Sequence, residues 1–415
     1  MTSHGSSHDL EDMDTLPRAT DSLFTRYSRP LFESVRNGWQ SHASAYLPLP
    51  SDETQKSPRW LQIAWSVVSA PRFRRYVVVY LTLFLLGWAG WGLLIHPRIK
   101  ERGALLRSLD PSSKDEVGGW FGTNSPPKFE GLIQLQTLDA QLVPGAAAEG
   151  AEAKSKSRRR LIVVGDVHGC KEELVALLDK VSFSIVHGDH LIFAGDIINK
   201  GPDSGGVVDL AREYSASCVR GNHEDRILLA RRQMVASNTL SQSDDSDEFS
   251  SAKELRERGL ARSLTEEQVQ WLEKCPVILK VGSIPGMGEV VVVHAGIVPG
   301  VDLEKQDPSS VMNMRTIDLK THVPSSSRKG TNWAKMFDKH QSMLYKSVEE
   351  SVADPESQTT TVIYGHDAKT GLNIRPYTKG LDSACVAGGK LTALVIEDGG
   401  KQSIVQTRCR KHDNQ

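Results

Sequence analysis

The residues in this sequence that are best suited to chemistry stand at the ends of short apolar runs. The first run, Leu161 to Val164, is followed by Gly165, Asp166 and, after one residue, His168. Four later runs stop in the same way, at Asp196, at Asn222 with His223, at His294 and at His366. Ligands of α/β proteins bind beyond the carboxyl ends of strands, so these runs predict strands that present polar side chains to one site.

These side chains carry the oxygen and nitrogen donors that divalent zinc, manganese, cobalt, iron or magnesium can use. The residues expected to bind metal are Asp166, His168, Asp196, Asn222, His294 and His366. If one carboxylate bridges, six ligands can hold two ions about 3.5–4 Å apart, a spacing that suits in-line displacement at phosphorus. A single buried His or Asp is more often structural, so the hypothesis depends on the whole ordered set.

The elements that must position these residues have the order of an α/β domain. Helical patterns, as in Glu172 to Val181, alternate with the apolar runs. Glycines precede the expected ligands because a tight turn from strand to loop tolerates a residue without Cβ. These glycines are Gly165, Gly195, Gly221 and Gly365. We expect the folded domain to span residues 158–415, with an acidic, serine-rich surface loop at 241–251.

The composition is that of a globular protein and argues against nucleic-acid binding. The chain has 415 residues, of which 39% are hydrophobic and 24% charged, and its formal net charge is −1. Binding to a phosphate backbone normally requires a basic excess, so we expect no nucleic-acid partner. The five cysteines contain no C-x-x-C pair. Their odd number leaves at least one thiol free if the others form disulfides. The cysteines therefore do not indicate whether the protein lies in a reducing or an oxidising compartment.

The N-terminal part of the chain predicts a membrane anchor. Residues 1–75 are rich in Ser, Asp, Arg and Pro, which is typical of a disordered tail. Residues 76–95 contain no charge and are long enough to cross a membrane as a helix; a buried core helix or a signal peptide fits this length and position less well. Five basic residues precede the span within twenty positions and five follow it, so charge alone does not fix the orientation. Because three arginines lie next to the span on its N-terminal side, we expect residues 1–75 to be cytoplasmic.

Residues 96–157 are expected to form a stalk and linker. Within them, the segment Phe129 to Leu138 is a candidate first strand of the following domain. The segment Ala146 to Ser157 has low complexity and no apolar periodicity, which is typical of a linker.

The strand-end motifs resemble those of the calcineurin-like metallophosphoesterases, in their phosphoprotein-phosphatase branch. The motifs that carry the resemblance are GDVHG (165–169), GDIINKG (195–201), GNHE (221–224), VHAG (293–296) and YGHD (364–367). The resemblance implies an α/β sandwich of two β-sheets flanked by helices. It also implies that Asp166 and His168 bind one ion, that Asp196 bridges, and that the remaining ligands bind a second ion.

The same resemblance assigns the non-ligand residues of the site. His223 is expected to protonate the leaving oxygen, and Arg220, just before GNHE, to hold phosphate oxygens. Asn199 and Lys200 stand where protein phosphatases of this branch carry Asp and Arg. We therefore expect Asn199 to act on His223 as a catalytic residue, with weaker polarisation than an aspartate would give.

Departures from the protein phosphatases bring the chain nearer to two other groups. The KGPDS run (200–204) and the LDSACV segment (381–386) are similar to bacterial diadenosine tetraphosphatases and, more closely, to fungal zinc-dependent endopolyphosphatases of the vacuole. This similarity implies a single-pass type II protein of the vacuolar membrane that hydrolyses internal phosphoanhydride bonds of inorganic polyphosphate with a metal-bridging hydroxide. A protein Ser/Thr phosphatase, a diadenosine tetraphosphatase-like hydrolase and, with least support, a non-catalytic scaffold are the alternatives.

A polyphosphate substrate requires cationic side chains along its path, since each internal phosphate carries about one negative charge. The residues expected to bind substrate are Lys200, Arg220 and Lys369, with Arg226 and Arg375 as further candidates. An exposed Lys or Arg is by default a solvated surface charge, so each assignment is a hypothesis.

Overall fold

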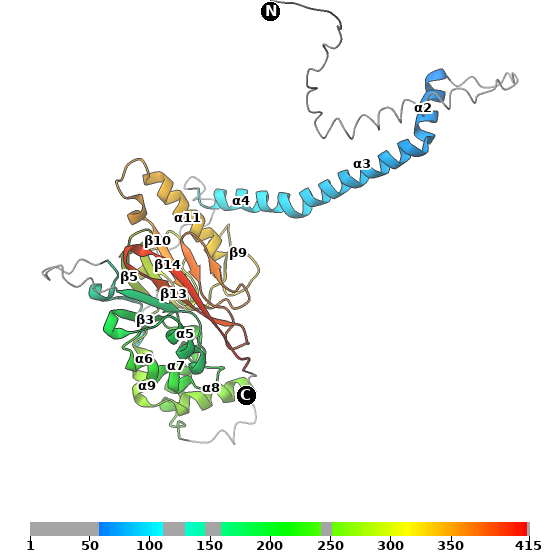
Figure 1. Cartoon of the computed structure of the whole chain (residues 1–415). Coiled ribbons are helices and arrows are strands. Elements are labelled where there is room, and N and C mark those ends of the chain that lie inside the picture. The colour runs from blue at the N-terminus through cyan, green and yellow to red at the C-terminus, as the bar shows by residue number, and fades with distance from the viewer. Residues whose placement is uncertain (1–57, 111–128, 146–158, 242–250, 413–415) are drawn as a thin grey trace, which may run out of the picture. The chain divides into compact units, whose positions relative to one another are not determined.

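The computed structural model describes residues 58–110, 129–145, 159–241 and 251–412 (Figure 1). The chain divides into two compact units, Met1–Gly90 and Trp91–Gln415. The expected acidic loop at 241–251 and the expected linker at 146–157 lie almost wholly outside the described residues.

The first unit contains two described helices, α2 (Arg59–Ser69) and α3 (Pro71–Gly90). Helix α3 buries none of its residues, although most of them are apolar. The helical stretch Pro71–Ser108 is the one helix in the described part of the chain that is long and apolar enough to cross a membrane, judged by length and composition. It covers the expected span at residues 76–95.

Helix α2 differs from the expected disordered tail at residues 1–75. Its apolar side chains, among them Trp60 and Trp65, recur at helical spacing, and Gln62 and Ser66 lie between them. This periodicity favours an amphipathic helix. The expectation of a disordered tail followed from the low apolar content of residues 1–57, which lie outside the described residues.

The second unit is built on two large β-sheets and one small sheet. The five-stranded sheet has the order β14-β13-β2-β3-β4, and the six-stranded sheet has the order β1-β5-β6-β10-β12-β11. The first comprises β2 (Arg160–Val164), β3 (Asp189–Phe193), β4 (Ser217–Cys218), β13 (Lys390–Ile396) and β14 (Gln402–Arg408). The second comprises β1 (Leu135–Thr137), β5 (Ile278–Ile284), β6 (Gly288–Val293), β10 (Thr360–Tyr364), β11 (Asn373–Ile374) and β12 (Thr378–Gly380). The small sheet, which was not anticipated, is formed by β7 (Thr316–Ile317), β8 (Pro324–Ser325) and β9 (Thr331–Asn332).

Strands within each large sheet run parallel where the expected ligands lie. β2 pairs in parallel with β3, and β3 with β4, while β10 pairs in parallel with β6. The predicted strands before Asp166, Asp196, His294 and His366 are therefore present, in two sheets. β4 is only two residues long and lies next to the GNHE turn.

Alternating side chains of β2 bury both of its faces. Leu161 and Val163 pack with residues of the other large sheet, such as Val292, in one core cluster. Ile162 and Val164 pack with helical residues in a second core cluster. The period of two places one face between the sheets and the other under helices. This arrangement confirms the expected α/β sandwich of two β-sheets flanked by helices.

Helices of the second unit cover the outer faces of the sheets (Figure 1). They are α5 (Lys171–Lys180), α6 (Ser204–Glu213), α7 (Asn222–Ala236), α8 (Ala252–Ser263), α9 (Glu266–Glu273), α10 (Pro308–Asn313) and α11 (Trp333–Val348). Helix α4 (His96–Ser108), after the π-helical turn Trp91–Ile95, buries residues only at its C-terminal end. Side-chain caps begin several of them: Asp203 accepts a hydrogen bond from Gly206 N at α6, and Thr265 forms a capping box at α9. The helix expected at Glu172 to Val181 is α5.

The second unit begins earlier than the expected boundary at residue 158. β1 pairs with β5, as the candidate strand at Phe129 to Leu138 indicated. Leu105 and Leu109 at the end of α4 are also buried in a core cluster of this unit. Ser108 Oγ lies 2.7 Å from His322 Nε2. Residues expected as a stalk therefore contribute to the folded unit, because their few apolar side chains complete a core formed much later in the sequence.

Two disulfides link segments that are distant in sequence. Cys218 of β4 is bonded to Cys275, and Cys385 is bonded to Cys409 at the end of β14. Cys170 is the free cysteine and is buried. The sequence predicted at least one free thiol but not the pairing.

Candidate active site

Residues that follow β2, β3 and β10 line one cavity of about 500 Å³, and the residue that follows β6 contacts one of them. Asp166 and His168 follow β2, Asp196 follows β3, and His294 directly follows β6. Asn222 is the first residue of α7. The structure therefore brings all six expected ligands together, because parallel strands deliver the residues that follow them to the same edge.

Asp196 lies at the centre of these side chains. Its Oδ2 is 3.5 Å from His168 Nε2, and its Oδ1 is 3.2 Å from His294 Nε2. Asp196 belongs to two groups of potential ligand atoms within 4.8 Å of one another, one with His168 and His223 and one with His294 and His366. A carboxylate shared by two groups has the position that a bridging ligand requires.

The remaining two ligands close the cluster from opposite sides. Asn222 Oδ1 lies 3.1 Å from His294 Nε2. Asp166 Oδ2 lies 4.0 Å from His168 Nε2, and the Asp166 carboxylate accepts hydrogen bonds of 3.0 and 3.1 Å from His366 N. Each predicted ligand thus contacts at least one other.

The three histidine ligands each use one ring nitrogen on a backbone carbonyl. His294 Nδ1 donates to Ala194 O at 2.9 Å, His168 Nδ1 to Ile198 O at 3.2 Å, and His366 Nε2 to Asn313 O at 3.1 Å. In the neutral form of each ring, the other nitrogen carries no proton and faces the cluster. This is the arrangement that orients imidazoles as metal ligands, so the donor set fits divalent cations.

The electrostatics of the cluster also favour positive charge. Burial opposes ionisation of Asp196, but the neighbouring histidines His294, His223 and His168 hold its pKa well below the usual range. Burial likewise opposes protonation of His294, yet Asp196 and Asp166 together raise the pKa of His294 to about 10. Burial, with the nearby Asp382, raises the pKa of Asp166. Buried carboxylates that raise the pKa of one imidazole this far are suited to bind cations.

Three of the expected ligands have a strained backbone. His168, Asp196 and His366 have positive φ angles of 50°, 49° and 69°. This backbone conformation costs about 1–3 kcal/mol for each residue that is not glycine. It persists where the surrounding structure holds it, typically at functional sites. Gly195, at φ 86°, is required for a second reason, because a Cβ there would lie 2.6 Å from His294 Nδ1.

Glu224 holds the loop that carries Asp196 through hydrogen bonds. No role was assigned to it from sequence. It is fully buried, and its Oε1 accepts from Ile197 N and Ile198 N at 2.8 and 3.1 Å. Its Oε2 accepts from Asp196 N and Gly221 N at 2.8 and 2.9 Å. One carboxylate therefore joins the turn after β3 to the turn before α7.

Asn199 sets the tautomer of His223. Asn199 Oδ1 accepts from Lys200 N at 2.8 Å, which leaves its Nδ2 to donate to His223 Nδ1 at 2.9 Å. His223 Nδ1 is then an acceptor, and the ring proton is on Nε2. Burial, with the cationic Lys200 and Arg226, lowers the pKa of His223 to about 2. An aspartate at position 199 would oppose this lowering, which agrees with the weaker polarisation expected from the sequence.

Lys200 lies at the cavity, as expected of a substrate-binding residue. Its Nζ donates to His168 Nε2 at 2.8 Å. Arg315, Arg328 and Lys411 also line the cavity, and none of them was proposed from sequence. They lie outside the strand-end motifs, in the small sheet and the C-terminal tail, so no local pattern marks them.

The structure does not bring Arg220 or Lys369 into the lining of this cavity. Arg220 is buried, and its guanidinium donates to Glu273 O at 2.9 Å and lies 3.7 Å from Asp225 Oδ1. Lys369 is exposed and is not among the lining residues, although its neighbour Ala368 is.

The two further candidates also fall outside the lining. Arg226 lies against His223, with its Nη2 3.0 Å from His223 Nε2. Arg375 is 3.6 Å from Asp338 Oδ2. Buried carboxylates and carbonyls compete for these cations, which sequence proximity to a motif does not reveal.

Comparison with known proteins gives one consistent result. Residues 159–370 match the model of the calcineurin-like phosphoesterase family. A zinc-dependent endopolyphosphatase of Saccharomyces cerevisiae is 29% identical over 279 residues, which cover 60% of this chain and 81% of that protein. A symmetrical bis(5'-nucleosyl)-tetraphosphatase of Nitrosospira multiformis is 27% identical over 287 residues, which cover 60% of this chain and 96% of that protein.

Among solved structures, a putative diadenosine tetraphosphatase matches with a TM-score of 0.48 and 30% identity over 66% of this chain and 98% of the other. The family match extends over the strands and turns that carry the six clustered donors. The chain belongs to the calcineurin-like phosphoesterases and is a metal-dependent phosphohydrolase.

Proposed function

We propose that this phosphohydrolase is a membrane-anchored endopolyphosphatase that cleaves internal phosphoanhydride bonds of inorganic polyphosphate. The observation that carries the proposal is the set of cations around the acidic and histidine cluster. Four basic residues line the cavity, from separate parts of the fold: Lys200, Arg315, Arg328 and Lys411.

Two of these cations are held beside the cluster by one carboxylate. Arg328 Nη1 lies 2.5 Å from Asp367 Oδ1, and Arg315 Nε lies 4.0 Å from the same atom. Arg315 Nη2 also donates to the carbonyl of His366 at 3.5 Å. Guanidinium groups bind phosphate oxygens in a planar, two-pronged manner, so prepositioned arginines suit a chain of phosphates. Each internal phosphate carries about one negative charge, which these cations offset as the chain passes the cluster.

The residues of the cluster have separable tasks. Asp166, His168, Asp196, Asn222, His294 and His366 would hold two divalent cations, which supply Lewis acidity and an activated water for attack at phosphorus. His223 is neutral in this environment, and from Nε2 it would donate a hydrogen bond to the departing phosphate oxygen, while Asn199 keeps it in this tautomer. Arg315 and Lys200, which line the cavity, would bind phosphate oxygens of the chain.

The lining of the cavity favours an inorganic chain over a dinucleotide. Several relatives are named bis(5'-nucleosyl)-tetraphosphatases, so this activity is the main alternative. Nucleobases are usually held by stacking on aromatic rings. No Phe, Tyr or Trp is among the described residues that line the cavity. The relative named as an endopolyphosphatase supports the same choice.

We further propose that the protein is a single-pass type II protein of the vacuolar membrane with its catalytic unit in the lumen. The exposed apolar side chains of α3 support a membrane span at residues 76–95, since such a surface is unfavourable in water. The two disulfides of the catalytic unit support a compartment outside the reducing cytosol. The arginines that precede the span support a cytoplasmic N-terminus.

The substrate is tested with the full-length protein in detergent and zinc, manganese or magnesium. Long-chain polyphosphate, diadenosine tetraphosphate and a phosphopeptide are offered at equal concentration, with Asp196→Asn as the inactive control. We expect chains of intermediate length from polyphosphate in the wild type and no cleavage in the variant. Activity confined to the dinucleotide or the phosphopeptide would refute the assignment, and a failure of every substrate would favour the scaffold.

The location is tested on intact vacuoles. Added protease should spare the catalytic unit until detergent opens the membrane. Digestion of the catalytic unit before detergent would contradict the proposed orientation.

A further inference from the structure

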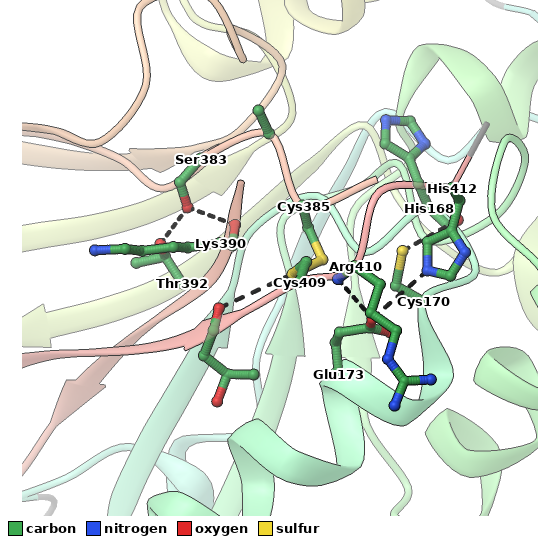
Figure 2. Close-up of a disulfide and its surroundings, with 12 residues drawn as sticks. His168, Cys170, Glu173, Ser383, Cys385, Lys390, Thr392, Cys409, Arg410 and His412 are labelled. Atoms are coloured by element: carbon green, nitrogen blue, oxygen red, sulfur yellow. Dashed lines mark hydrogen bonds and ion pairs between the residues drawn. A yellow bond between two sulfur atoms is a disulfide. The ribbon is translucent and has the colours of Figure 1, made fainter. Parts of the chain in front are cut away.

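A second group of metal-binding side chains lies beside the active cavity and contains none of the six clustered ligands. Cys170 Sγ, a carboxylate oxygen of Glu173 and a ring nitrogen of His412 all lie within 4.8 Å of one another. Figure 2 shows these three residues together next to the Cys385–Cys409 disulfide, with His168 beside them. Sulfur, imidazole nitrogen and carboxylate oxygen are all donors that zinc accepts.

Helix α5 supplies two of the three donors from rigid, buried positions. Cys170 is the N-cap residue of α5, and Glu173 is in its first turn. Residues three apart lie on the same face of a helix, so both side chains point the same way. Cys170 is fully buried, and Glu173 is 6% exposed. Their positions are therefore fixed by the helix before any ion binds.

The C-terminal tail brings in the third donor. Arg410 N donates to Glu173 Oε1 at 3.2 Å, and His412 N donates to Val386 O at 3.1 Å. His412 Nε2 then lies 3.5 Å from Glu173 Oε1. This nitrogen is buried and has no hydrogen-bond partner among the described residues. An unpaired buried polar atom is unfavourable, and a cation between it and Glu173 would give it a partner.

A role for Cys170 as a reactive thiol fits the structure less well. The Cys170 side chain is fully buried, whereas reactive cysteines are partly exposed. A cation that reaches the group through the cavity, which His412 also lines, can displace the thiol proton and use the sulfur as a ligand.

We propose that Cys170, Glu173 and His412 form an additional cation site, selective for a zinc-like ion, that fastens the C-terminal tail to α5. Three protein ligands leave one position for water or for a substrate oxygen. Because Lys411 and His412 line the cavity, the ion would hold this wall in place. The proposal stands apart from the polyphosphate assignment, since it concerns different ligands.

Cobalt(II) spectroscopy separates this site from the active site. All five cysteines lie in the described residues, and four of them form disulfides, so Cys170 is the single thiol. A thiolate-to-cobalt charge-transfer band in the near ultraviolet can therefore arise only from Cys170. The nitrogen and oxygen donors around Asp196 give no such band. Full-length oxidised protein is titrated with cobalt, and we expect a band that saturates at one equivalent and disappears when zinc is added.

Variants test the other two ligands. His412→Ala and Glu173→Gln should each weaken cobalt binding, read from the band, at least tenfold, and Cys170→Ser should abolish the band. His187→Ala, an exposed histidine in the turn Ile185–His187, is the matched control and should leave it unchanged. If Cys170→Ser does not fold, His412→Ala decides, because the His412 side chain is 23% exposed. A wild type without the band, or a band unchanged in both ligand variants, would overturn the proposal. If the wild-type protein did not cleave polyphosphate, the cobalt band would still test this site, because it depends on the Cys170 thiolate and not on the polyphosphate assignment.

Discussion

Replacement of Glu224 by glutamine should destabilise the catalytic unit strongly, although the two side chains have the same shape. The Glu224 carboxylate accepts four backbone N–H groups, two on each oxygen. An amide can accept on only one side, so Glu224→Gln would leave two buried N–H groups facing an NH₂ group. Each buried donor without a partner costs about 1–3 kcal/mol, which gives a loss of about 2–6 kcal/mol. Burial, with repulsion from Asp196, raises the pKa of Glu224 to about 7, so removal of this charge offsets part of the loss.

The loss should be visible in urea unfolding of the full-length protein, followed by tryptophan fluorescence of the catalytic unit. With a slope of about 2 kcal/mol per M, a loss of 2 kcal/mol lowers the midpoint by about 1 M. Glu304→Gln, at an exposed site on a short 3₁₀ turn, is the matched control and should not change the midpoint. Turnover should fall as well, because Glu224 holds the amide of Asp196. A midpoint equal to that of the control would refute the reasoning that one carboxylate fastens both turns.

The remaining predictions concern separate parts of the fold. Asp196→Asn should abolish turnover with the unfolding midpoint kept within the range of surface variants; measurable turnover would remove its assigned bridging role. His223→Ala should lower kcat by about 10²–10⁴-fold with the metal content unchanged, as measured by atomic emission, and a lower metal content would instead make His223 a ligand. Replacement of both Cys218 and Cys275 by alanine should cost about 4 kcal/mol of stability, because the loop that this disulfide closes contains 57 residues; thermal unfolding that matches the wild type would contradict this loop-closure origin. Burial lowers the pKa of His190 from 6.5 to about 4, so the unfolded chain takes up a proton that the folded chain does not, and stability is lost as the pH falls through this window. Between pH 7 and pH 4, the free energy of unfolding of the wild type should fall by about 3 kcal/mol more than that of His190→Gln. Equal losses would show that His190 is not the group responsible for this pH dependence.

The six clustered donors could be located from sequence because each stands within a few residues of the end of an apolar run. Local order alone places Asp166 after β2 and Asp196 after β3. Parallel pairing of β2 and β3 then brings the two strand ends to the same edge of the sheet. The fold class followed from the same alternation of runs and helical patterns.

Other parts of the site depend on contacts that no local pattern records. Arg315 and Arg328 reach the cavity from the small sheet, whose strands are two residues long and too short to be recognised. The basic side chain expected to bind phosphate, Arg220, is instead held by the carbonyl of Glu273. Such competition between partners is decided by tertiary packing. The pairing of the cysteines was open for the same reason.

The position of the last strand has a consequence for how the protein is made. β14 and the residues that follow it form an edge of the five-stranded sheet and a wall of the active cavity, and the Cys385–Cys409 bond joins them to the segment before β13. Residues up to 412 must therefore leave the ribosome, and an oxidant must act on the two cysteines, before the cavity is complete. Nascent chains that have not yet exposed these residues should have no competent active site.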